Sequence, residues 1–269
     1  TTTAIHPYYG SGWNRNTVYP LLGFDNMIFK DAFTTPKKIR NYISDESAFQ
    51  KIIDLYEEKG TDEKLFAFEV TMQNHGGYSK DTDDFRESVY LTDELNQGTQ
   101  VRAAEKYLTL IQKSDEAFKE LVEYFEKQKE PTIILMFGDH QPSDYITNVI
   151  LRELDLDRDE SQDVYFDNYI VPYIMWSNYD MDTTQVENIS LNYLSGLLME
   201  KAGIGLTGYQ QFLKDMQAEL PVITANMVME ADGDREPEKD VQSEWIENYN
   251  KLVYNHLCDK TGRLSGFFE

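Results

Sequence analysis

Three apolar segments of this chain each lead into a histidine, and this pattern constrains the fold more than any other feature. They are 1–5 (TTTAI) before His6, 65–74 (LFAFEVTMQN) before His75, and 132–139 (TIILMFGD) before His140. Short apolar runs rich in β-branched and aromatic residues are typical of buried strands. In open α/β sheets, ligands bind beyond the carboxyl ends of the strands. We therefore predict that the three histidines share one site at one edge of a sheet.

Helical patterns lie between these segments. Apolar residues recur at helical spacing over 47–58 and 101–125, whereas residues 7–23 are predicted to form a loop rich in Tyr, Gly and Asn. A fourth strand is predicted over 169–176, where Pro172 favours an edge or bulged position. Strands alternating with helices predict an α/β fold with a mostly parallel β-sheet flanked by helices.

The last third of the chain is predicted to be helical and to belong to the same single domain. Two capping-box patterns mark helix starts: Thr184 with Glu187, and Thr207 with Gln210. Residues 230–240 (EADGDREPEKD) predict an acidic loop, and a C-terminal helix follows it. Cys258, the single cysteine, falls in the apolar stripe of that helix and is expected in the core.

The charge balance limits the possible partners. The 269 residues include 48 acidic and 25 basic side chains, a formal net charge of −23. Nucleic-acid binding needs a basic surface, so we expect no nucleic-acid partner. The opening at TTTAI, without a Met, looks like a cut inside a larger protein.

Two adjacent residues, Asp139 and His140, are candidate metal ligands. A carboxylate and an imidazole suit one divalent ion, and Gly138 and Pro142 bend the chain where both side chains can turn toward it. The short motif is equally compatible with an aspartate that caps the next helix and a histidine that bonds to backbone.

Two further loops carry candidate binding residues. In HPYYGSGWNR, the planar fork of Arg15 suits phosphate or sulfate and Trp13 offers a flat wall for a small polyol, beside His6. In MQNHGGY, the double glycine lets the backbone around His75 approach a ligand. The structural alternatives are an aromatic loop packed on the surface and a polar turn.

Four segments in order, HPYYGSGWNR, YPLLGFD, MQNHGGY and FGDHQPS, carry a resemblance to a known family. They resemble the lipoteichoic acid synthase-like (phosphoglycerol transferase) members of the sulfatase/alkaline phosphatase superfamily. The resemblance runs through at least residues 1–177, and His-x6-Trp-x-Arg is its most specific part. It implies an alkaline phosphatase/sulfatase-like fold, N-terminally truncated, with residues 1–269 as the C-terminal portion of a catalytic domain.

The resemblance also implies a role for each candidate residue. Asp139 and His140 correspond to ligands of a catalytic Mn²⁺ or Mg²⁺, and His75 to a histidine that contacts the substrate phosphate. The pocket for glycerophosphate corresponds to His6, Trp13 and Arg15. The family's Thr or Ser nucleophile and a further acidic ligand are expected upstream of this chain. The metal site is therefore expected to be incomplete here, and the chain alone to be inactive.

Three functions remain open from the sequence. The first is a metal-dependent phosphoglycerol transferase or phosphodiesterase that acts on a glycerophosphate-bearing lipid or cell-envelope polymer. Its parent protein would be anchored by an N-terminal segment and face outward from the cell membrane. The second is a sulfatase of the same superfamily, and the third is a non-catalytic module that binds an anionic glycopolymer. A phosphoethanolamine transferase is less favoured, because those relatives are disulfide-rich and this chain has one Cys.

Overall fold

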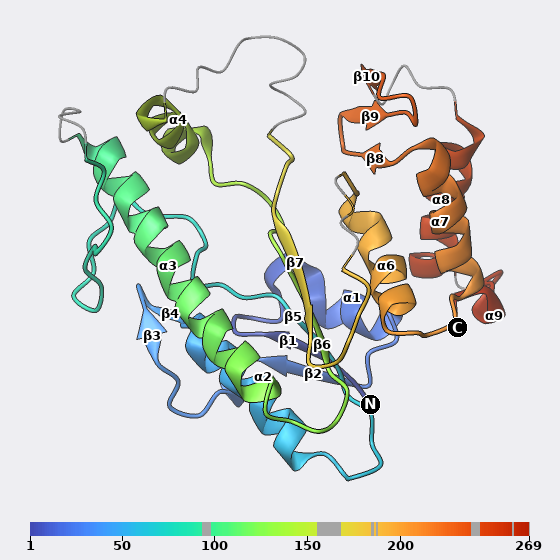
Figure 1. Ribbon diagram of the computed structural model, residues 1–269, viewed down its shortest axis with the longest axis horizontal. Helices are drawn as coiled ribbons and strands as arrows, with labels where there is room; N and C mark the ends of the chain where they lie inside the picture. The colour runs from blue at the N-terminus through green and yellow to red at the C-terminus, as the bar shows by residue number, and fades with distance from the viewer. Residues whose placement is uncertain are drawn as a thin grey trace. The chain divides into compact units, whose positions relative to one another are not determined.

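The computed structural model describes residues 1–92, 98–154, 168–183, 186, 188–237, 243–259 and 261–268. These residues form two compact units, Thr1–Lys129 with Pro142–Arg158, and Glu130–Gln141 with Asp159–Glu269. Figure 1 follows the chain through both units, and each is described by itself.

The first unit is built on a three-stranded parallel sheet in the order β2-β1-β5. Its strands are β1 (Thr2–His6), β2 (Asn26–Phe29) and β5 (Phe66–Glu69). Residues of β1 pair with both neighbours, for example Ile5 with Ile28 and with Glu69. The predicted α/β class with a parallel sheet is confirmed, and the strands before His6 and His75 are neighbours whose carboxyl ends lie at the same edge.

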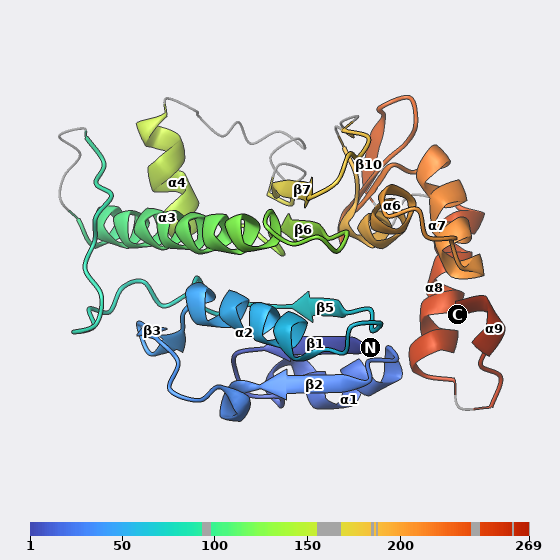
Figure 2. The same cartoon turned by 60° about the horizontal axis from the view of Figure 1, so that its bottom comes forward.

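Helices cover this sheet and pack on one another (Figure 2). Helix α2 (Asp45–Glu58) begins at Ser44, whose side chain accepts a hydrogen bond from the Ser47 amide and so satisfies one free donor of the first turn. Helix α2 packs along α3 (Thr99–Phe125), so both predicted helices are present. The core against the sheet consists of Ile5, Phe33 and Ile43, joined by Ile28, Ile52, Leu55 and Ala67.

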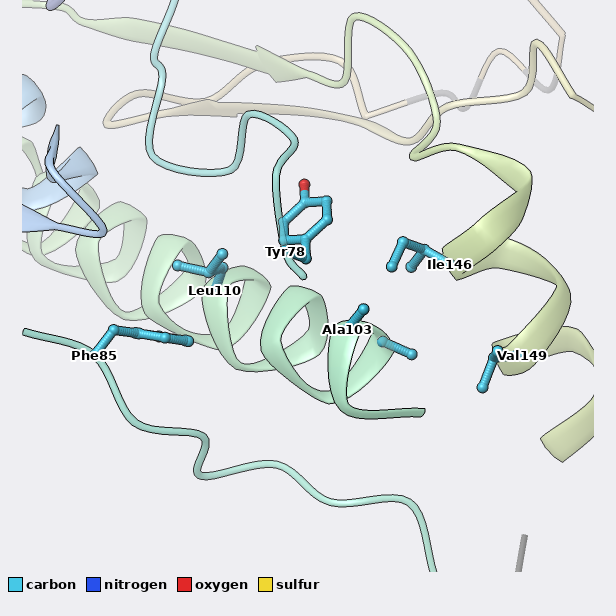
Figure 3. Close-up of a cluster of buried hydrophobic side chains, with 7 residues drawn as sticks. Tyr78, Phe85, Ala103, Leu110, Ile146 and Val149 are labelled. Atoms are coloured by element: carbon cyan, nitrogen blue, oxygen red, sulfur yellow. The ribbon is translucent and has the colours of Figure 1, made fainter. Parts of the chain in front are cut away.

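A second core lies along the N-terminal half of α3. Helix α4 (Asp144–Glu153) and the segment after β5 pack against α3 there (Figure 3). Its buried members are Tyr78, Phe85, Ala103, Ala104, Leu110, Ile146 and Val149. This packing holds the segment that follows His75 against a long helix.

The predicted loop over 7–23 is partly wrong. The turn η1 (Gly12–Asn14) leads directly into helix α1 (Arg15–Leu21). Seven helical residues with Pro20 among them are too few to show a helical period in the sequence. Further short elements also escaped prediction: η2 (Lys30–Ala32) and the antiparallel hairpin of β3 (Lys38–Ile39) and β4 (Tyr42–Ile43).

In the second unit, β6 (Ile133–Phe137) pairs antiparallel with β7 (Tyr173–Ser177). Both predicted strands exist, but β6 belongs to this two-stranded sheet and not to the parallel one. An apolar run shows that a strand is buried and does not choose its partner, which explains the difference. The prediction that Asp139 and His140 follow a strand of the same sheet as His6 and His75 is therefore wrong, whereas a site shared by these residues stays a prediction.

The remainder of the second unit is mostly helical. Its elements are η3 (Leu191–Tyr193), α6 (Leu194–Lys201), α7 (Gly208–Glu219), β8 (Val222–Ile223), β9 (Met227–Met229), β10 (Arg235–Pro237), α8 (Glu244–Leu257) and α9 (Ser265–Phe268). The predicted helix start at Thr207 is confirmed, because its hydroxyl accepts a hydrogen bond from the Gln210 amide at 3.2 Å. Strand β10 lies within the predicted acidic loop 230–240.

Two other sequence expectations in this unit have different outcomes. The predicted cap at Thr184 and Glu187 lies outside the described residues. The core position expected for Cys258 is wrong, since its side chain is exposed just past the end of α8. Among the described helices, none is both long and apolar enough to cross a membrane.

Candidate functional site

His6 forms the buried floor of the candidate site. It is the last residue of β1 and is fully buried, and its Nδ1 atom lies 2.7 Å from the carbonyl oxygen of Val70, just past β5. A carbonyl only accepts, so Nδ1 carries the proton and Nε2 is the acceptor. Nε2 is buried and has no hydrogen-bond partner in the described structure. Burial, helped by the nearby positive charge of Arg15, lowers the pKa of His6 and keeps the ring neutral.

Trp13 and Arg15 come from the loop after β1. Trp13 and Asn14 both adopt left-handed backbone angles (φ 51° and 55°), a strained pair that ends directly at helix α1. The loop can close only because Gly10 has no side chain, since a Cβ there would lie 2.9 Å from the Phe29 ring. The Trp13 ring is 59% exposed and lies edge-on to His6, with ring centres 5.9 Å apart.

The Arg15 guanidinium is stacked and partly unpaired. Its Cζ atom lies 4.6 Å from the centre of the Trp13 ring, and its Nε donates to the Tyr19 hydroxyl at 2.9 Å. Its Nη1 is buried and has no hydrogen-bond partner among the described residues. A guanidinium held from one side with a free buried nitrogen is suited to accept an anion.

His75 completes the cluster from the loop after β5. Its ring centre lies 5.7 Å from that of Trp13, so Trp13 is in contact with both histidines. The structure thus brings together four of the six predicted site residues: His6, Trp13, Arg15 and His75. The group consists of a buried imidazole acceptor, a guanidinium with one nitrogen that lacks a partner among the described residues, an exposed aromatic face and an exposed imidazole. Such a set can hold a small anion that also carries hydroxyl groups.

Sequence reasoning missed the β3–β4 hairpin as a part of this cluster. Tyr42 of β4 lies with its ring centre 6.2 Å from His75 and 6.0 Å from Tyr8. Arg40, in the turn of the hairpin, donates to the carbonyl oxygens of His75 and Gly76. The turn has two successive positive φ angles, for which Asn-Gly or Asp-Gly is the usual sequence signal, and Arg40-Asn41 does not match that signal.

A buried polar network underlies the His75 loop. Gln73 accepts from the Asp45 amide at 3.1 Å, and the Ser114 hydroxyl on α3 donates to the Asp45 carboxylate. Asn74 donates to Ser114 at 2.8 Å. Burial raises the pKa of Asp45 to about 6, and burial together with the Asp45 charge raises the pKa of Glu69 well above its usual range.

Asp139 and His140 lie in the second unit, directly after β6. The Asp139 Oδ2 and His140 Nε2 atoms are 3.7 Å apart, and both side chains are largely exposed. The Nδ1 of His140 donates to the Gln141 carbonyl at 2.8 Å, which leaves Nε2 free in the manner typical of a metal-bound histidine. These two atoms fit as two ligands of one ion. Among the described residues, no group of three or more His, Cys, Asp or Glu side chains is placed to hold a metal.

Comparison with known proteins identifies the family. The sequence model of the sulfatase family matches residues 1–204. The chain belongs to the sulfatase family. The matched range contains all six predicted site residues and all of the first unit. The sequence-based resemblance to this superfamily is therefore confirmed.

Curated relatives of this sulfatase-family chain include two proteins from Rhizobium meliloti and one from Haemophilus influenzae. A Rhizobium meliloti protein named for modification of cyclic β-1,2-glucan is 28% identical over 247 residues, which cover 90% of this chain and 37% of that protein. The capsular polysaccharide biosynthesis protein RkpI of the same organism is 29% identical over 52% of this chain and 24% of its own length. The chain thus spans less than half the length of these relatives.

Solved structures confirm the fold. The Streptococcus pyogenes phosphoglycerol transferase GacH, solved with sn-glycerol-1-phosphate, superposes with a TM-score of 0.68 at 19% identity, over 100% of this chain and 64% of GacH. The lipoteichoic acid synthase LtaP of Listeria monocytogenes gives 0.57 at 15% identity, over 95% of this chain and 68% of LtaP. An alkaline phosphatase superfamily protein from Vibrio parahaemolyticus gives 0.55.

Proposed function

We propose that this sulfatase-family chain is the substrate-binding part of a phosphoglycerol transferase or phosphodiesterase that acts on a glycerophosphate-bearing lipid or cell-envelope polymer. One observation carries the proposal. The buried Nη1 of Arg15 and the buried Nε2 of His6 have no hydrogen-bond partner among the residues that the structure describes, and both residues contact the same exposed indole of Trp13. The guanidinium supplies a cationic donor for a phosphate, and the imidazole supplies an acceptor for a hydroxyl group.

Each residue would have a distinct task in binding. Arg15 would neutralise the phosphate, which matters in a chain with a net charge of −23. Trp13 would cover the carbon skeleton of the glycerol, and His6 would accept a hydrogen bond from one of its hydroxyl groups. His75, exposed beside Trp13, would donate to a phosphate oxygen.

The proposed chemistry is covalent. The hydroxyl of a Thr or Ser outside residues 1–269 would attack the phosphorus, and the lipid alcohol would leave with a proton. An acceptor alcohol would then take the glycerophosphate group and free the nucleophile. The positive charge of Arg15 and a hydrogen bond from His75 would stabilise the charge that develops on the phosphoryl oxygens.

The cofactor in this proposal is Mn²⁺ or Mg²⁺. Asp139 and His140 are the residues of this chain that would hold it, because two atoms that can act as metal ligands, Asp139 Oδ2 and His140 Nε2, are 3.7 Å apart. A bound divalent ion would polarise a phosphoryl oxygen and lower the pKa of a coordinated hydroxyl. Such ions take about six ligands, so other donors would complete the shell.

The place of action follows from the same proposal. A lipid or envelope polymer substrate would lie at the outer face of the cell membrane, where we place the parent protein. The acidic surface of this chain would be repelled by anionic lipids, so a membrane anchor would need to come from elsewhere in the parent.

The test is a comparison of ligands. Isothermal titration of the 269-residue chain with glycerol phosphate, inorganic phosphate and inorganic sulfate separates the candidate functions. Glycerol phosphate is expected to bind most tightly, because only it uses His6 and Trp13 as well as Arg15. Sulfate binding as tight as that of glycerol phosphate would instead favour the sulfatase alternative.

The third candidate, a non-catalytic glycopolymer-binding module, is tested at the parent protein. Turnover of a glycerophosphate-bearing lipid by the parent supports the transferase. A parent that binds an anionic glycopolymer yet fails to cleave the lipid under saturating Mn²⁺ would favour the binding module.

A further inference from the structure

The turn of the β3–β4 hairpin contains an unusual residue for its backbone. Arg40 and Asn41 both have positive φ angles, 53° and 68°, as two-residue hairpin turns require. Asn tolerates this conformation, but a left-handed backbone is strained at Arg. Turn side chains normally reach into water, yet Arg40 is only 6% exposed. A buried, strained arginine at this place needs contacts that offset its cost.

Those contacts are with the loop that carries His75. The Arg40 guanidinium donates to the His75 carbonyl oxygen at 3.4 Å and to the Gly76 carbonyl oxygen at 3.2 Å. Its Cζ atom also lies 4.7 Å from the centre of the Tyr78 ring. One side chain therefore holds three of the four residues from 75 to 78.

The loop needs such support because its own sequence is flexible. His75 is followed by two glycines, and Gly77 has a φ of 98°, which other residues rarely adopt. The His75 amide donates a hydrogen bond to the Met72 carbonyl oxygen at 3.0 Å. Ordering this segment costs conformational entropy, and the contacts with Arg40 offset part of that cost.

The same hairpin also supports the ring of His75. Tyr42, two residues after Arg40, lies 6.2 Å from the His75 ring between centres, and Trp13 lies 5.7 Å from it. We propose that Arg40 is the positioning residue for His75, with Tyr42 as the wall that limits its ring. This inference rests on the proposed function, in which His75 contacts the substrate phosphate.

Two substitutions of Arg40 test it. Arg40→Lys keeps the positive charge and loses the planar fork, whereas Arg40→Asn suits the left-handed turn and loses both. Lys38→Gln is the matched control, because it removes an exposed positive charge from the same hairpin. Thermal unfolding of each variant establishes that it folds.

The first readout needs no ligand. In the free wild-type chain, nuclear Overhauser contacts are expected between the His75 ring and the rings of Trp13 and Tyr42. Both sets are expected to weaken or vanish in the folded Arg40→Lys variant, whereas the contacts between His6 and Trp13 remain in it. In the Lys38→Gln control, all of these contacts are expected to remain. Unchanged contacts of His75 in a folded Arg40 variant would overturn the proposal.

The second readout is the affinity for glycerol phosphate. Arg40→Lys is expected to weaken binding about tenfold in the wild-type background and less than about twofold in a His75→Ala background, because coupled residues are non-additive. Equal losses in both backgrounds would overturn a positioning role. If the wild-type chain does not bind glycerol phosphate, the proposed function fails, and the ring contacts of the free chain still decide the role of Arg40.

Discussion

The Nδ1 atom of His6 donates a 2.7 Å hydrogen bond to the carbonyl oxygen of Val70, and this contact decides which ring nitrogen carries the proton. Val70 lies one residue past β5, and its own amide donates to the Ile5 carbonyl at 3.0 Å. The parallel pairing of β1 with β5 thus sets the tautomer of a buried imidazole. Two adjacent strands orient a side chain that neither strand could orient alone.

His6→Asn separates the two nitrogens of this ring. The Asn amide can still donate to the Val70 carbonyl, but it has no acceptor at the position of Nε2. We expect unchanged folding and about tenfold weaker binding of glycerol phosphate, the scale of one lost hydrogen bond to a bound ligand. Isothermal titration measures the affinity. Wild-type affinity in this variant would show that Nε2 does not contact the ligand.

His6→Leu is the companion variant, because it fills the volume and leaves the Val70 carbonyl without a donor. We expect the free energy of unfolding to fall by about 1–3 kcal/mol, the usual cost of one unpaired buried polar group. Urea unfolding followed by circular dichroism measures this change.

Arg15→Ala tests the anion site. Removal of a charged contact in a confined site is expected to weaken the binding of glycerol phosphate by roughly 2–4 kcal/mol. Lys30→Ala is the control, since Lys30 lies over the ring of Tyr9 and carries the same charge on the neighbouring segment. Titration of both variants should show a loss for Arg15 alone. Equal affinities for wild type and Arg15→Ala would mean that this loop has a structural role only.

Asp45 is expected to make the stability depend on pH. Burial raises its pKa from 3.8 to about 6, so the folded chain favours the neutral form. The stabilisation is complete below pH 4 and is lost as the pH rises through 6. Relative to Asp45→Asn, the wild type should lose up to about 3 kcal/mol of unfolding free energy between pH 4 and 7.5.

Urea unfolding at several pH values measures this difference for Asp45→Asn, with Asp62→Asn as an exposed control. The groups that face Asp45 are Ser114, Thr71, Gln73 and Glu69, and burial also raises the pKa of Glu69. A wild type and an Asp45→Asn variant with parallel pH profiles would contradict the assignment.

The metal and the activity of this chain form the last prediction. Asp139 and His140 supply two ligands, whereas Mn²⁺ and Mg²⁺ take about six, so we expect weak binding to the 269-residue chain. The chain should not cleave a chromogenic phosphodiester under saturating Mn²⁺. Electron paramagnetic resonance of Mn²⁺ reports binding, and Asp139→Asn should remove what little occurs. Turnover at the rate of the parent would place the nucleophile within residues 1–269.

The sequence determined the local part of this structure. Apolar runs predicted β1, β5, β6 and β7, and helical spacing predicted α2 and α3, because these patterns repeat over neighbouring residues. His6, Trp13 and Arg15 were predicted together because they lie in one short segment, HPYYGSGWNR. His75 joined them because parallel strands place their carboxyl ends at one edge of a sheet.

Only the tertiary structure decided the contacts between residues far apart in the chain. Arg40 reaches His75 across 35 residues, and Ser114 reaches Asp45 across 69. No local sequence pattern encodes such pairs. The antiparallel partner of β6 and the exposure of Cys258 are likewise not encoded locally. Secondary structure follows from the preferences of neighbouring residues. The partner of a buried polar group is set by the packing of the whole chain. Each such group must form a hydrogen bond inside the protein, because burial removes its hydrogen bonds to water.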